Sequence, residues 1–75
     1  MKIKLIWDFY GDDAEQTAMH HEIHLKEFAE IDQLPYSETG VIQSKPGHFY
    51  AFITVEKEHM IPFRDALKPH RGLKA

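Results

Sequence analysis

Residues 39–56, TGVIQSKPGHFYAFITVE, decide the fold because they contain two strand-like segments joined by a tight turn. Pro46 fixes φ for the second position of a turn, and Gly47 tolerates the positive φ that a type II turn requires at the third. We therefore predict a hairpin with strands over 39–44 and 48–56. The second strand is apolar on both faces, which is typical of a central strand.

The segment 2–10 before this hairpin alternates apolar side chains, which predicts a strand whose inner face carries Ile3, Leu5, Trp7 and Phe9. Gly11 ends the strand. Asp12 is placed to cap a helix, with Glu15 completing an Asp version of the capping box. Helical spacing predicts this helix over 13–31, with an apolar stripe formed by Ala14, Ala18, His21, Leu25, Phe28 and Ala29.

A second helix is predicted from near His59 to about residue 68, because Met60, Phe63 and Leu67 share one face. Pro62 favours this start, since a proline in the first helical turn loses no hydrogen bond. Pro69 and Gly72 end the helix. The four residues after Arg71 are expected to form only a stub of a further strand.

These elements predict one α+β domain over 1–75, with the order β-α-β-β-α. We expect a three-stranded antiparallel sheet of order 1-3-2, with two helices on one face. This is a ferredoxin-like, split βαβ arrangement without most of its last strand. At the level of fold, the chain resembles the dimeric α/β-barrel superfamily, which includes cofactor-independent monooxygenases, isomerases, haem-degrading enzymes and many uncharacterised small bacterial proteins. The resemblance implies a dimer with two sheets packed face to face.

The composition of the chain limits the classes of function that the protein can have. A chain of 75 residues is only marginally able to stabilise itself, and without cysteine it has neither disulfides nor thiolate metal sites, so a partner subunit would help. The formal charge of −3 argues against nucleic-acid binding, which needs clustered Lys and Arg. With no signal-peptide core and no apolar run long enough to span a bilayer, we expect a cytoplasmic protein that does not bind membranes.

The outer face of the predicted sheet is unusually apolar, and such a surface on a soluble protein marks an interface or a ligand groove. Three alternatives remain open: the tail covers part of this face, two copies pair through it, or it binds a small ligand or another protein. A partner strand could also add to the free edge of the first strand. The candidate ligand or interface residues on this face are Ile6, Asp8, Tyr10, Ile42, His48, Tyr50 and Phe52, with Thr54 beside them.

Histidines are concentrated in the first predicted helix, and the chain has six in all. His20 and His24 are one turn apart, a common metal-binding spacing, and Glu27 falls on the same side. We therefore predict His20, His24 and Glu27 as candidate ligands for Zn²⁺ or another divalent metal, with His59 or His70 able to join them. The alternative is structural, because His21 lies in the core stripe and the other two histidines lie at its edge.

No motif specifies a reaction. The chain has no cysteine nucleophile, serine elbow or phosphate-binding glycine loop. Acid-base residues on the outer face, namely Asp8, Tyr10, His48 and Tyr50, could move protons on a small substrate, as a cofactor-independent oxygenase or isomerase would require. A binding module is the favoured interpretation, and that enzyme is the alternative.

Overall fold

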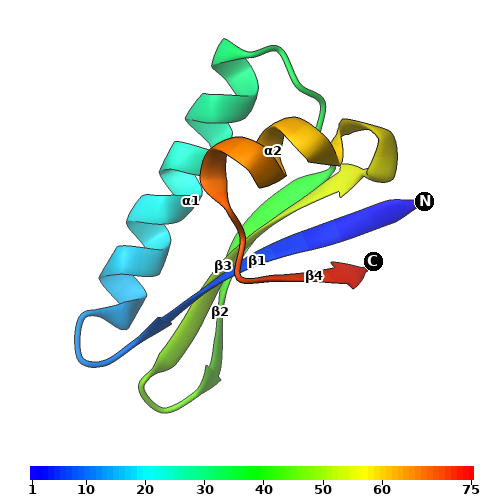
Figure 1. Cartoon of the computed structure of the whole chain (residues 1–75). Coiled ribbons are helices and arrows are strands. Elements are labelled where there is room, and N and C mark those ends of the chain that lie inside the picture. The colour runs from blue at the N-terminus through cyan, green and yellow to red at the C-terminus, as the bar shows by residue number, and fades with distance from the viewer.

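A computed structural model of residues 1–75 shows one twisted sheet with both helices on the same side of it (Figure 1). None of the helices is both long and apolar enough to cross a membrane. The elements, in chain order, are β1 (Lys2–Tyr10), α1 (Ala14–Ile31), β2 (Glu38–Lys45), β3 (His48–Glu56), the 3₁₀ turn η1 (Lys57–His59), α2 (Met60–Leu67) and β4 (Arg71–Lys74).

The sheet has four antiparallel strands in the order β2-β3-β1-β4, so the prediction of three strands in the order 1-3-2 was wrong. The four residues of β4 pair with Ile3–Ile6 of β1. Backbone hydrogen bonds extend this pairing at both ends, from the His70 N–H to the Ile6 oxygen at 2.9 Å and from the Ala75 N–H to the Lys2 oxygen at 3.0 Å. The short tail forms a strand because β1 presents unpaired backbone groups along that edge. The complete order is β-α-β-β-α-β.

The predicted hairpin is confirmed. β2 and β3 pair antiparallel on either side of Pro46 and Gly47, with a register shift between Gln43 and Lys45. Gly47 has a φ of +79°, the positive value that the turn requires. β3 lies between β2 and β1, as its two apolar faces predicted.

The start of α1 differs in detail from the prediction. Asp13, not Asp12, is the N-cap residue, and no side chain caps the helix. The first free N–H group is satisfied by backbone instead, because the N–H of Ala14 donates to the Gly11 oxygen at 3.2 Å. The capping-box role predicted for Asp12 and Glu15 is therefore not used.

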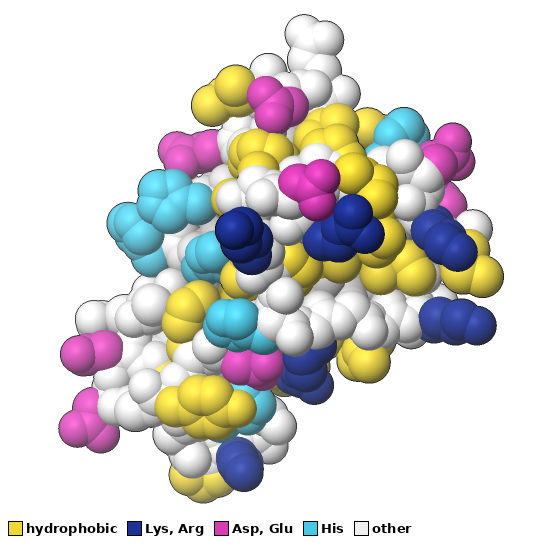
Figure 2. Space-filling view, viewed as in Figure 1, with side chains coloured by type: hydrophobic (Ala, Val, Ile, Leu, Met, Phe, Trp, Pro, Cys, Tyr) yellow, Lys and Arg dark blue, Asp and Glu magenta, His cyan; other side chains and the backbone are white.

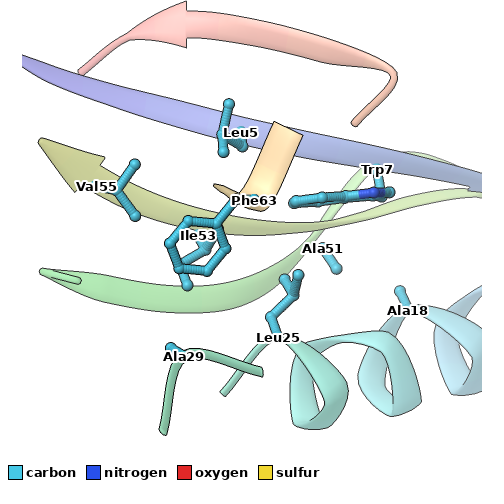
Figure 3. Close-up of a cluster of buried hydrophobic side chains, with 9 residues drawn as sticks. All are labelled: Leu5, Trp7, Ala18, Leu25, Ala29, Ala51, Ile53, Val55 and Phe63. Carbon is cyan, nitrogen blue, oxygen red and sulfur yellow. The ribbon is translucent and has the colours of Figure 1, made fainter. Parts of the chain in front are cut away.

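The core lies between the helices and the inner face of the sheet (Figure 3). α1 contributes Ala18, Leu25 and Ala29, and the two small alanines let the helix approach the strands closely. The buried Trp7 ring also donates its Nε1–H to the carbonyl of Leu67 at 2.8 Å, which fixes the end of α2 against the sheet. The inner face predicted from alternation is confirmed, and it consists of Ile3, Leu5, Trp7, Phe9, Phe49, Ala51, Ile53 and Val55.

Replacing Phe63 by Ala should cost about 3–5 kcal/mol of unfolding free energy, because this ring is fully buried and its removal leaves a cavity. Ile61→Ala on the same helix is the matched control, since that side chain is 44% exposed, and it should change stability by less than about 0.5 kcal/mol. Urea unfolding followed by the fluorescence of the single tryptophan measures both. Equal losses would show that α2 is not anchored through Phe63.

Candidate functional site

The outer face of the sheet, which no helix covers, is partly closed by its own long side chains. Ile6 is 1% exposed and Phe52 is 7% exposed, so the expectation that both are open to a partner was wrong. The Lys4 ammonium lies 4.5 Å from the centre of the Phe52 ring, a cation–π distance. Gly40 provides the space for this ring, because a Cβ atom there would lie 2.7 Å from it.

The tail contributes to this closure, as one of the three sequence alternatives proposed. β4 occupies the edge of β1 next to Ile6, and Arg71 extends over the outer face. Its guanidinium carbon lies 5.4 Å from the centre of the Tyr50 ring. β4 covers only part of the edge of β1, because its pairing ends at Ile6 and leaves residues 7–10 without a partner strand on that side. On β1 itself, a partner strand could add only along this remaining stretch.

Asp8 is the centre of a polar cluster on this face. Its Oδ1 accepts hydrogen bonds from His48 Nε2 at 2.7 Å and from Arg71 Nη2 at 2.9 Å, and its Oδ2 accepts one from Arg71 Nε at 2.9 Å. The side chains of Asp8 and His48 are each only 10% exposed. The cluster therefore joins β1, β3 and β4 through one shielded carboxylate.

The charge state of Asp8 follows from these contacts. Burial alone would raise the pKa of this carboxyl, but the hydrogen bonds from Arg71 and His48 and the attraction of their charges outweigh burial and hold the pKa below its ordinary value. The same pairing raises the pKa of Arg71. The ion pair is thus present throughout the neutral pH range.

Sequence reasoning missed the role of His70 and Arg71. The Asp8 N–H donates to His70 Nδ1 at 2.8 Å, so the imidazole replaces a strand partner where β4 has not yet begun. In the sequence, Arg71 only precedes the expected terminal stub, because its place on the outer face depends on β4. His70 lies directly before β4 and Arg71 is its first residue, and both form hydrogen bonds with Asp8 of β1.

The aromatic neighbours shape what this cluster can do chemically. Tyr10 stacks on His48, with ring centres 4.5 Å apart and planes 9° from parallel. Because His48 Nε2 donates to a carboxylate, Nδ1 of the neutral ring keeps its lone pair and makes no hydrogen bond within the chain. In that form, His48 could accept a hydrogen bond from a ligand N–H or O–H at that atom. No hollow adjoins Asp8 and Tyr50 to hold a substrate, however, since the one pocket of the molecule lies over α1.

That pocket is a shallow, open hollow of about 360 Å³ beside the histidines of α1. Figure 2 shows histidine side chains gathered over this helix on one side of the molecule. The residues that line the hollow are Gln16, Thr17, His20, His21 and His24.

The predicted metal ligands are neighbours but do not surround a common point. The ring centres of His20 and His24 are 4.6 Å apart, whereas Glu27 Oε1 contacts His24 Nδ1 at 3.1 Å. His70 is at the edge of β1 and His59 is in η1, so neither joins the pair. The structure holds no group of three or more His, Cys, Asp or Glu side chains placed to bind a metal ion.

His21 occupies the half-buried position that its place in the apolar stripe predicted. Its ring lies 4.9 Å from Trp7 and 5.5 Å from Phe9, and its Nε2 is buried without a hydrogen-bond partner. Burial lowers the pKa of His21, and the charges of His24 and His70 lower it further. The neutral ring is therefore the form that packs against the sheet.

Comparison with protein-family models, curated proteins and solved structures finds no match to this chain.

His21→Phe should reduce the loss of stability in mild acid. The unfolded chain protonates His21 near the ordinary pKa of 6.5, whereas the folded chain does so only at lower pH, so stability falls as pH drops from about 6.5 through the lowered pKa. Phenylalanine removes this contribution. Urea unfolding at about pH 7.5 and 5.5 measures the difference, with His59→Phe as the control variant. If His21→Phe and wild type lose the same stability between the two pH values, the buried neutral imidazole is not the cause.

Proposed function

We propose that this protein is a homodimeric binding module in which two copies pack the outer faces of their sheets together. The observation that carries the proposal is the exposure of large apolar and aromatic side chains on a sheet face that no helix covers. Ile42 on β2 is 40% exposed, Leu73 on β4 is 49% exposed and Tyr10 on β1 is 71% exposed. Together they span the full width of the sheet, from one edge strand to the other.

The charge on this face favours a second copy of the chain as its partner. The whole chain has a formal charge of −3, which opposes self-association in general. The register places one residue from each of the four strands in a row across the outer face: Glu38, Thr54, Lys4 and Leu73. The same register adds Lys2, Glu56 and Lys45 to the outer face. With Asp8 and Arg71 the face carries three acidic and four basic side chains, so its charge is nearly balanced and two such faces meet with little net repulsion.

The buried centre of the face limits how tightly the two copies can pair. Ile6 and Phe52 are already shielded within one chain, so the apolar surface left for the interface consists of the flanking side chains and the half-buried Tyr50. Obligate dimers present more hydrophobic surfaces than this. We therefore place the association in the range in which monomer and dimer exchange.

Pairing would also enclose the Asp8 cluster. Tyr10, Tyr50 and the free Nδ1 of His48 would then face a partner sheet instead of solvent, and the N–H groups of Arg71 not used by Asp8 would lie beside them. A small flat ligand matches these contacts if it carries an acceptor group, such as a carboxylate for the Arg71 N–H groups, and an N–H or O–H donor for His48 Nδ1. Two sheets packed face to face is also the arrangement of the superfamily that the chain resembles. The cytoplasmic location expected from the sequence belongs to the same proposal.

Ile42→Lys tests the proposal, because it places a charge within the β2 side of the interface while leaving the core unchanged. At tens of micromolar, wild type should sediment as a dimer, or as monomer and dimer in exchange. Ile42→Lys should raise the dissociation constant of the dimer at least tenfold, so that the monomer predominates. Ile23→Lys is the matched control: Ile23 is 53% exposed on α1, away from the outer face, and its replacement should leave self-association unchanged.

Analytical ultracentrifugation over a concentration series separates these outcomes. A wild-type protein that stays monomeric at hundreds of micromolar contradicts the dimer. Equal effects of Ile42→Lys and Ile23→Lys contradict the placement of the interface on the sheet.

A further inference from the structure

The histidines over α1 form a second site that does not depend on the outer face of the sheet. His20 and His24 both line the shallow hollow of about 360 Å³, and no hydrophobic residue lines it with them. Both histidines are exposed at the helix surface. We propose that they form a two-histidine chelate for a divalent transition-metal ion.

The distance between the two rings fits this role. Their centres are 4.6 Å apart and their planes are 73° from parallel. Two imidazoles bound to one ion through nitrogen at about 2.0–2.1 Å, in adjacent coordination positions, place their ring centres about 4.5–5.2 Å apart. One turn of helix between residues 20 and 24 thus positions the rings for chelation without a change of backbone.

Glu27 orients one ligand and is not itself a ligand. A carboxylate only accepts hydrogen bonds, so the 3.1 Å contact makes His24 Nδ1 the donor to Glu27 Oε1. The Nε2 atom of His24 then carries the lone pair and is free to bind a metal. A carboxylate behind a metal-binding imidazole is the usual supporting arrangement in such sites, because it fixes the tautomer and raises the basicity of the ring. The sequence-based assignment of Glu27 as a ligand is replaced by this positioning role.

The surroundings of the pair favour a cation. His21 forms the side of the hollow next to the sheet and packs against Trp7, so it lies beside the pair and keeps its own place in the core. Glu27 adds one negative charge. Two imidazole ligands suit ions of the nickel, copper and zinc group, and water or an external ligand would complete the coordination shell.

Isothermal titration of the untagged chain with Ni²⁺ and with Zn²⁺ tests the site. We expect wild type to bind one ion with a dissociation constant in the micromolar range, and both His20→Ala and His24→Ala to bind at least tenfold more weakly. Glu27→Gln should weaken binding about tenfold, because the amide holds the imidazole less firmly. His59→Ala, which removes a histidine from η1, should bind like wild type.

Circular dichroism of each variant shows whether the fold is kept, as exposed positions predict. Three results overturn the proposal: wild-type binding weaker than about 1 mM, binding that survives in both His20→Ala and His24→Ala, or an equal loss in His59→Ala. A loss in only one of the two chelate variants overturns the two-histidine geometry. Unchanged affinity in Glu27→Gln overturns the positioning role.

Discussion

The outer half of the molecule depends on the hydrogen bonds that the carboxylate of Asp8 accepts. It accepts three side-chain hydrogen bonds from two strands, and the N–H of the same residue holds His70. A buried carboxylate without partners would be costly, whereas one with this many donors stabilises its surroundings only while all of them stay in place. β4, the shortest strand, is therefore held by the charged Arg71–Asp8 pair and by His70 as well as by its own backbone pairing.

The sequence predicted those parts of the fold that depend on local rules. Alternation placed β1 and β3, the Pro46-Gly47 pair placed the hairpin, and helical spacing together with Pro62 placed both helices within a few residues. These local rules could not predict β4. Arg71–Lys74 is too short to show a period, and its strand conformation comes from the edge of β1, which lies about 70 residues away in the sequence.

The sequence predicted which residues belong to the candidate site but not how their side chains are arranged. Alternation correctly put Asp8 and His48 on the same face, and the register makes Asp8 and Tyr50 cross-strand neighbours. It could not show that Lys4 and Arg71 lie across Phe52 and Tyr50, because the direction of a long flexible side chain depends on what it contacts in three dimensions. For the same reason the outer face is less open than its composition suggested. The two proposed sites lie on either side of the unpaired end of β1, where Phe9 contacts both His21 and His70.

The pKa of the Asp8 carboxyl tests this account most directly, because burial and hydrogen bonding push it in opposite directions. Titration of the Asp8 side-chain carboxyl carbon by NMR, in the intact folded chain, measures it without a mutation. If Arg71 and His48 hold the carboxylate as described, its pKa lies below the ordinary value of 3.8. A pKa at or above 3.8 in the folded protein would mean that burial dominates, and that the cluster does not hold β1, β3 and β4 together.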